Sequence, residues 1–200
     1  TDDTIYGTTG DVVISVSRKD GSVRWKRDLG KKSIRRLAVE DGRVYVPTRK
    51  GDSGYGTNPD DTRIYALDTR DGTIEWKTGF GNEVPAGPAT LGEDELYVSL
   101  SDGTVASMDK LTGAVRWTER IGGSSSTAPI LHDQTVYIGN KAGELHLIES
   151  ETGEDRRNYS VSESISGIAI EGSTVAVTHQ STVTVLDRIS GEQRWKYRSK

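Results

Sequence analysis

The sequence predicts an all-β protein built as a β-propeller, or as an arc of one, and three observations carry this prediction. The first is an internal repeat with a period of roughly forty residues. The second is that each copy divides into short β-favouring segments separated by glycine-containing turns. The third is composition: Gly (23), Ser and Thr are plentiful, whereas hydrophobic residues make up only 32%. This composition is typical of many short strands joined by tight turns.

The repeat becomes visible when the chain is aligned on a glycine that is followed four residues later by tryptophan. The five copies are SVSRKDGSVRW (15–25), ALDTRDGTIEW (66–76), SMDKLTGAVRW (107–117), LIESETGEDRR (147–157) and VLDRISGEQRW (185–195). Successive glycines are 51, 41, 40 and 38 residues apart, and an insertion of about eleven residues, Lys50 to Asp60, explains the longest spacing. We treat the chain as a single domain, residues 1–200, whose blades 1 to 5 have the approximate bounds 1–29, 30–80, 81–121, 122–160 and 161–200.

Each complete blade is predicted to contain four antiparallel strands. In blade 3 these strands are residues 84–91, 95–100, 104–109 and 114–120. The second strand recurs along the chain with a tyrosine in register, at Tyr6, Tyr45, Tyr97 and Tyr137. Small four-stranded sheets cannot bury both faces alone, so they must stack on neighbours, and stacking around an axis gives a propeller. A parallel β-helix would need a much shorter repeat.

Three positions of the repeat have a mechanical interpretation. The glycine lies in the hairpin between the third and fourth strands, where it takes φ > 0 at no steric cost. The acidic residue four positions earlier accepts backbone N–H bonds across this turn. The tryptophan lies on the outer strand, where its ring packs against the neighbouring sheet and its N–H finds an acceptor. These positions are Gly21, Gly72, Gly113, Gly153 and Gly191; Asp68, Asp109 and Asp187, with Ser17 and Glu149 as variants; and Trp25, Trp76, Trp117 and Trp195.

This repeat, [A/V/S]-L-D-x-x-[T/S/D]-G-x-x-x-W after a V-Y-x-G strand, resembles that of the pyrroloquinoline-quinone-like (PQQ-like) β-propellers. The resemblance covers almost the whole chain, and residues 66–76 are similar to the tryptophan-docking motif of quinoprotein dehydrogenases. Arg157 stands where the fourth copy would have tryptophan, so the resemblance does not carry the docking contact over to blade 4. The lysine that often follows the glycine in the family is replaced by Ser22, Thr73, Ala114, Glu154 and Glu192.

The PQQ-like family contains two functional classes, and the fold alone does not choose between them. Quinoprotein dehydrogenases hold a quinone near the axis, with calcium, a catalytic Asp and often a vicinal Cys pair. The non-catalytic class includes the lipoprotein of the bacterial outer-membrane assembly machine, kinase-linked sensor domains and cell-surface repeat proteins. The chain has no cysteine and fewer than the roughly seven or eight blades of the enzymes. We therefore expect a non-catalytic scaffold without a cofactor; PQQ and calcium belong only to the alternative of a dehydrogenase fragment.

Two segments are candidate partner-binding sites, because loops that leave the second and fourth strands share one face of a propeller. The loop 29–36 carries a cationic cluster that can receive an acidic segment or a carboxylate, unless it is simply a solvated loop. Its members are Lys31, Lys32, Arg35 and Arg36. The insertion offers polar side chains for partner contact; calcium or glycan binding, and a tolerated loop extension, are the alternatives. These side chains are Asp52, Tyr55, Asn58, Asp60 and Asp61.

Several functions lack support in the sequence. The net charge of −4 gives no general attraction to nucleic acid, and no apolar stretch is long enough to span a membrane. His132, His146 and His179 lie in separate parts of the repeat, so we expect no shared metal site. No G-x-S-x-G, Walker or H-E-x-x-H motif occurs. We expect a protein partner or further propeller blades, and an extracytoplasmic location, either periplasmic or at the cell surface.

The ends of the repeat array predict an arc. Blade 1 begins at its second strand, and blade 5 ends just after its fourth, which gives nineteen of the twenty strands of five blades. Both edges would then be unpaired. We therefore expect an arc of a larger propeller of roughly seven or eight blades. A five-bladed ring and an edge-to-edge dimer are the alternatives.

Overall fold

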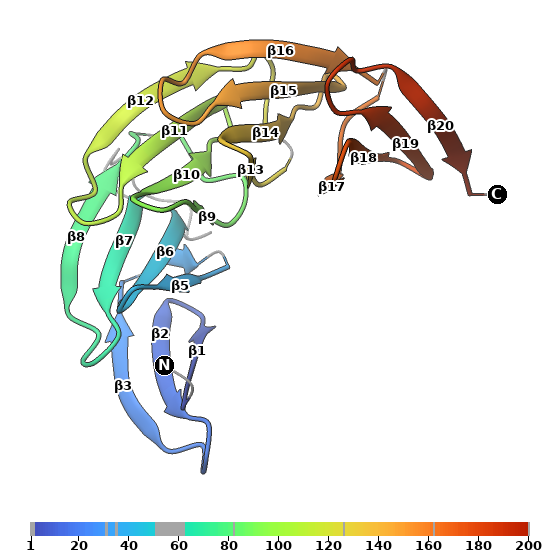
Figure 1. Cartoon of the computed structure of the whole chain (residues 1–200). Helices are drawn as coiled ribbons and strands as arrows, with labels where there is room; N and C mark the ends of the chain where they lie inside the picture. The colour runs from blue at the N-terminus through green and yellow to red at the C-terminus, as the bar shows by residue number, and fades with distance from the viewer. Residues whose placement is uncertain are drawn as a thin grey trace.

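The computed structural model describes residues 3–30, 32–34, 36–50, 63–81, 83–125, 127–161 and 163–199. Within these ranges the chain forms twenty strands and no helix, and the strands make five antiparallel sheets. Figure 1 shows the sheets following one another in chain order around an open arc, with the N-terminal and C-terminal sheets at its two ends. The predicted fold class, an all-β propeller arc, is confirmed.

Blades 1, 3, 4 and 5 are simple meanders in which each strand pairs with the next. Blade 1 has three strands, β1 (Thr4–Thr9), β2 (Val12–Ser17) and β3 (Val23–Asp28). Blade 3 comprises β9 (Thr90–Leu91), β10 (Glu95–Ser99), β11 (Thr104–Asp109) and β12 (Val115–Arg120). Blade 4 comprises β13 (Ile130–His132), β14 (Thr135–Gly139), β15 (Glu144–Glu149) and β16 (Asp155–Ser160). Blade 5 comprises β17 (Gly167–Glu171), β18 (Thr174–His179), β19 (Thr182–Asp187) and β20 (Gln193–Arg198).

Blade 2 departs from the expected four strands because its first strand is divided. The two pieces are β4 (Lys32–Ile34) and β5 (Ala38–Glu40), and both pair with β6 (Arg43–Lys50). The sheet continues with β7 (Arg63–Asp68) and β8 (Ile74–Gly79). With eight residues, β6 is longer than the second strands of the other blades, so it offers room for two short partners. The expected nineteen strands therefore become twenty in the described part of the chain.

The first strand of blade 3 is shorter than the predicted range 84–91. Only Thr90 and Leu91 form a strand, and Pro85 makes an isolated bridge to Leu100. Proline has no backbone N–H to donate to a sheet. Pro85 and Pro88 therefore interrupt the pairing that the alternation of the sequence suggested.

A β-bulge recurs between the third and fourth strands of all five blades. In blade 1, Ser15 lies opposite Trp25 while the next residue, Val16, lies opposite Val23, which leaves Arg24 as the extra residue. The same register shift follows Ala66, Ser107, Leu147 and Val185. A bulge bends the strand and redirects its side chains. It lies directly beside the tryptophan position of each repeat.

In the described part of the chain the buried hydrophobic side chains form four clusters, one at each boundary between blades. The cluster between blades 2 and 3, for example, joins Tyr45 and Trp76 to Leu96 and Met108. Strands β10 and β14 of the middle blades are buried on both faces after their first residue, whereas β2 and β18 of the terminal blades alternate between more and less buried positions. Stacking between neighbours therefore supplies the core that one sheet cannot supply alone.

Candidate partner-binding sites

Tryptophans connect the first four blades through one repeated contact. The indole Nε1 of Trp25 donates to the Thr69 carbonyl at 2.9 Å, Trp76 donates to Lys110 at 3.0 Å, and Trp117 donates to Ser150 at 2.9 Å. Each acceptor lies three residues before the turn glycine of the following blade. Each ring also lies near the second-strand tyrosine of its own blade, with centroid distances of 5.9 to 6.1 Å.

The turn glycines are the surface on which these rings rest. All five have φ between 70 and 77°, which L side chains rarely adopt. A Cβ atom built on Gly72 would come within 2.6 Å of the Trp25 ring, and one on Gly153 would come equally close to Trp117. Gly21, at the start of the arc, has nothing within 4 Å of that position. The glycine thus allows both the turn and the approach of the ring.

The boundary between blades 4 and 5 uses different side chains for the same task. Arg157, at the tryptophan position, donates from Nη1 to the Ile189 carbonyl, and the Tyr159 hydroxyl donates to that carbonyl at 3.0 Å. The Tyr159 ring lies against the Cα of Gly191, in the way the indoles lie against the other glycines. The repeat pattern did not point to Tyr159, which lies two residues beyond the aligned position.

The acidic turn residues accept bonds from the turn backbone. Asp109 Oδ1 accepts from the Leu111 and Thr112 amides at 3.0 and 2.9 Å. Asp187 Oδ1 accepts from Ile189 and Ser190, both at 2.9 Å. In Asp68, Oδ1 accepts from the Arg70 amide at 2.7 Å. At the two variant positions, the Ser17 hydroxyl accepts from the Lys19 amide at 3.2 Å, and Glu149 accepts from the Thr152 hydroxyl at 2.7 Å.

Arginines beside these carboxylates lower their pKa values. The Arg70 side chain bonds to Asp68 and lowers its pKa to about 2, and Arg116 does the same for Asp109. For Asp187, the Ser190 amide and then Arg194 hold the pKa well below its usual range. The lowered pKa values show that these carboxylates are stabilised in the charged form by the turn and by the neighbouring arginine, which is a structural role.

The structure places the cationic loop next to the base of the insertion. Strand β4 pairs with the end of β6, with Lys32 opposite Lys50 and Ser33 opposite Arg49. Arg36 and Arg49 are exposed. The other predicted contact residues, Lys31, Arg35, Asp52, Tyr55, Asn58, Asp60 and Asp61, lie outside the described residues. The backbone of residues 32–34 in the cationic loop is therefore paired with residues 48–50, where the insertion begins.

The three histidines have separate partners. His146 Nδ1 lies 2.6 Å from Asp155, His179 lies between Glu163 at 2.8 Å and Thr184 at 2.9 Å, and His132 is 3.4 Å from Asp133. Within the described ranges, no group of three or more His, Cys, Asp or Glu residues is placed to hold a metal ion. The same ranges contain no helix long and apolar enough to cross a membrane.

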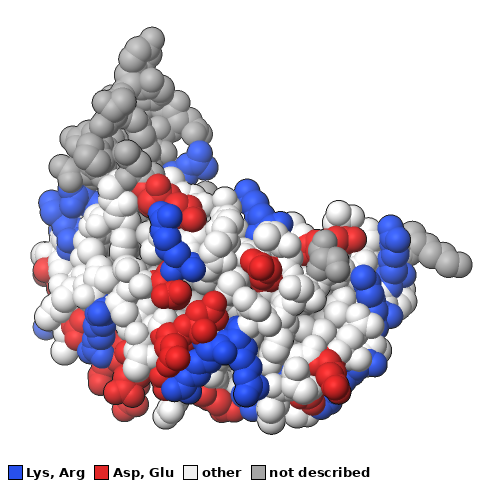
Figure 2. All heavy atoms as spheres, turned by 90° about the horizontal axis from the view of Figure 1, so that it is seen from above, with Lys and Arg blue, Asp and Glu red and all other residues white. Residues whose placement is uncertain are grey.

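Charged side chains on the surface are mixed in sign. Figure 2 shows the molecule of Figure 1 from above, and acidic and basic groups are interspersed over this face. Many of them form ion pairs, such as Arg120 with Asp102 at 2.6 Å and Arg43 with Glu75 at 2.5 Å. The described charges on this face therefore form no extended field of one sign for a polyanion.

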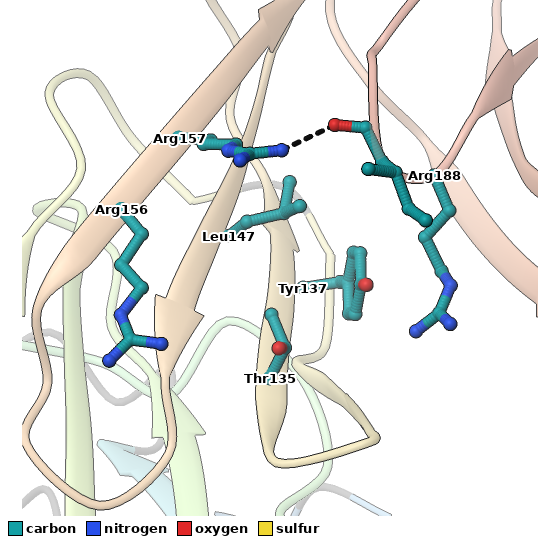
Figure 3. Close-up of a pocket in the computed structure, with 7 residues that line it drawn as sticks. Thr135, Tyr137, Leu147, Arg156, Arg157 and Arg188 are labelled. Atoms are coloured by element: carbon teal, nitrogen blue, oxygen red, sulfur yellow. Dashed lines mark hydrogen bonds between the residues drawn. The ribbon is translucent and has the colours of Figure 1, made fainter.

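Two pockets lie at corresponding places between neighbouring blades. Both are at the end of the sheets where turns join the first strand to the second and the third strand to the fourth. The pocket between blades 2 and 3 has a volume of about 300 Å³ and that between blades 4 and 5 about 250 Å³. Tyr45 and Lys110 line the first, and the equivalent residues Tyr137 and Arg188 line the second. Figure 3 shows the second pocket, where arginines surround Tyr137, Leu147 and Thr135.

Stacked four-stranded sheets with a repeated ring-on-glycine contact define a β-propeller of PQQ-like repeats, as the sequence resemblance predicted. A family model described as outer membrane protein assembly factor BamB matches residues 9–166. The chain belongs to this family.

Individual relatives agree with this assignment. The outer membrane protein assembly factor BamB of Yersinia pestis is 22% identical over 207 aligned residues, which cover 92% of this chain and 51% of the relative. The chain thus spans about half the length of this curated relative.

Solved structures show the same fold at low sequence identity. BamB from Moraxella catarrhalis superposes with a TM-score of 0.76 at 19% identity, over 98% of this chain and 58% of that one. The computationally designed Ika8 protein gives a TM-score of 0.75 at 16% identity, over 96% and 60% of the two chains. A europium-containing methanol dehydrogenase gives 0.74 at 14% identity, over 98% and 49%. The same fold thus occurs in an outer membrane protein assembly factor, in a designed protein and in a dehydrogenase.

Proposed function

We propose that this chain is a non-catalytic scaffold that binds a protein partner through the face of blade 2. The observation that carries this proposal is the pairing of β4 with the end of β6, which joins the cationic loop to the base of the insertion. Loops held on a rigid sheet are where propellers present binding residues. Exposed Arg36 and Arg49 give this face a positive character suited to an acidic segment.

The family supports the same proposal. The matched relatives are named as outer membrane protein assembly factors, and assembly is a task of binding, not of bond making. A factor of this kind acts outside the cytoplasm, so we propose a periplasmic or cell-surface location. We propose no cofactor. The partner is an acidic protein segment, or further propeller blades on which the terminal sheets stack.

Site-specific photo-crosslinking in the native host tests the proposed face. A photoreactive residue replaces Arg36, and a matched control replaces Lys77, which is exposed in the middle of β8. We expect Arg36 to give a discrete cross-linked protein of the outer-membrane assembly pathway, and the Arg36→Glu and Arg49→Glu double variant to lose affinity for it. Equal yields from both positions, or an unaffected charge-reversed variant, would reject the blade 2 face.

The similarity to a methanol dehydrogenase supports one alternative, a segment of a quinone-dependent enzyme. Incubation with PQQ and calcium, followed by absorbance of bound cofactor and dye reduction, distinguishes the two functions. The scaffold proposal expects neither signal. Turnover in this assay would overturn it.

A further inference from the structure

The exchange of tryptophan for arginine changes the shape of the boundary between blades 4 and 5. In blades 1 to 3 the residue opposite the tryptophan is small, at Ser15, Ala66 and Ser107. In blade 4 the pair is Leu147 and Arg157. Tyr137 therefore has no indole beside it, unlike the equivalent tyrosines of blades 1 to 3. The space beside Tyr137 forms the pocket of about 250 Å³.

Three guanidinium groups surround this pocket. Arg156 and Arg157 come from β16, and Arg188 comes from the turn between β19 and β20. In Figure 3, Arg156 and Arg188 lie on opposite sides of Thr135 and Tyr137, while Arg157 reaches across toward blade 5. Apolar side chains, Leu147 and Ile189, complete the lining. The pocket thus combines cationic sides with an apolar floor.

The charges of these arginines are only partly balanced. Arg156 pairs with Glu149 at 2.5 Å, and Arg188 pairs with Asp133 at 2.9 Å. The guanidinium of Arg157 contacts the Ile189 carbonyl and has no carboxylate partner among the described residues. The Nε of Arg188 is buried and has no hydrogen-bond acceptor there. One positive charge and one buried donor therefore remain uncompensated.

The equivalent pocket between blades 2 and 3 is balanced by the protein itself. Lys110, at the position of Arg188, is held by Glu40 at 2.6 Å and Asp41 at 3.2 Å. In blade 4 the first of these two positions is occupied by His132. The acidic residues Glu93, Asp94 and Asp109 also line the pocket between blades 2 and 3. Among the described residues that line the pocket between blades 4 and 5, none is acidic.

We propose that the pocket between blades 4 and 5 binds a carboxylate of a partner polypeptide, presented next to an aromatic side chain. The carboxylate pairs with Arg157 and accepts from Arg188, because guanidinium groups bind carboxylates through paired N–H donors. The aromatic ring packs on Leu147 and beside Tyr137, both of which line the pocket. A single uncompensated charge matches a carboxylate better than a phosphate group, which carries close to two charges.

This pocket and the proposed blade 2 face lie at opposite ends of the strands. The pocket adjoins the turn between the third and fourth strands, whereas β4 and the insertion adjoin loops at the other end. The inference therefore does not depend on the proposed function. Loss of binding at one site leaves the other to be tested separately.

Two small probes test the pocket. N-acetyl-tryptophan has the ring and the carboxylate, and N-acetyl-tryptophanamide has the same ring without the charge. In 15N-labelled protein, we expect the acid to shift the Nε–Hε signals of Arg157 and Arg188, and the amide to bind at least about tenfold more weakly. Equal binding of the two probes would overturn the proposal. Stronger competition by inorganic phosphate than by acetate would assign the pocket to phosphate and also overturn it.

Substitutions in the pocket test whether N-acetyl-tryptophan binds there. Arg157→Gln keeps a donor for the Ile189 carbonyl but removes the charge, and we expect it to weaken N-acetyl-tryptophan binding about fivefold or more. Arg116→Gln, in the pocket between blades 2 and 3, is the control and should leave binding unchanged. Leu147→Phe keeps every charge and fills the floor, so it should abolish binding. Circular dichroism verifies the fold of each variant, and unchanged affinity in both Arg157→Gln and Leu147→Phe rejects the site.

Discussion

The boundary between blades 3 and 4 and the boundary between blades 4 and 5 solve the same problem with different side chains. At the first, the single indole of Trp117 donates to Ser150 and covers Gly153. At the second, Arg157 and Tyr159 both donate to Ile189, and the Tyr159 ring covers Gly191. The comparison teaches that the constant part of the contact is the acceptor backbone and the bare glycine. The donor and the ring can be divided between two side chains.

The largest loss of stability is expected when the turn glycine, which is common to both boundaries, is replaced. Gly153→Ala adds a Cβ within 2.6 Å of the Trp117 ring at a φ of 77°. Strain and overpacking together should lower the free energy of unfolding by about 3–4 kcal/mol. Gly10→Ala is the control, because its φ is 63° and nothing lies within 4 Å; it should cost only about 1 kcal/mol. Urea titration measures both, and equal losses would contradict the role of ring contact.

A second prediction compares the two donors. Trp117→Ala removes the ring and its hydrogen bond, so we expect a loss of about 3 kcal/mol. Arg157→Ala leaves the Tyr159 contact in place, so the loss should be about 1 kcal/mol. Thermal or urea unfolding gives the difference. A loss for Arg157→Ala as large as that for Trp117→Ala would show that Tyr159 does not share the task.

Acid should weaken the aspartate-closed turns. A carboxyl group whose pKa is lowered on folding stabilises the protein above its unfolded pKa, and that stability is lost as pH falls through the folded pKa. For Asp109 the pKa falls on folding from the ordinary value of 3.8 to about 2, so its contribution is lost as the pH falls through this interval. The contribution of Asp109 to stability should thus be constant above about pH 5 and decline below it. Asp109→Asn should lower stability at pH 7 by about 1 kcal/mol, allowing for solvent screening, and flatten the acid decline. An equally steep decline in the variant would contradict this.

The smallest effect is expected at the end of the arc. Trp195 occupies the repeat position in blade 5, but 53% of its surface is exposed. Trp195→Phe should change the free energy of unfolding by less than about 0.5 kcal/mol. It should also remove most of the tryptophan fluorescence that iodide quenches, since Trp25 and Trp76 are only 8% exposed. Undiminished quenching in the variant would place an exposed indole elsewhere.

The sequence was sufficient for the fold class because the repeat, the turn glycines and the strand alternation are local and occur five times. It was insufficient where one blade departs from the average. Nothing in the repeat indicates that β6 pairs with both β4 and β5. In blade 3 the alternation predicts a longer first strand than Pro85 and Pro88 permit. Arg157 was recognised as an exception, yet its replacement by Tyr159 depends on contact with another blade.

The binding residues were less accessible to sequence reasoning. The cationic loop and the insertion remain predictions, since most of their residues lie outside the described ranges. The pocket between blades 4 and 5 was missed, because Arg156, Arg157 and Arg188 are brought together only by stacking. The available signal was Arg157, at a position where the other four copies have tryptophan.

The contacts between blades also give the arc a direction. In the docking contact at every boundary, the donor side chain belongs to the preceding blade and the acceptor carbonyl to the third-to-fourth-strand turn of the following one. A unit of roughly forty residues can therefore be duplicated within the array and still meet a complementary neighbour on each side. A unit inserted in reversed orientation would place donor against donor. We expect that such proteins change in length by whole blades added in the same sense.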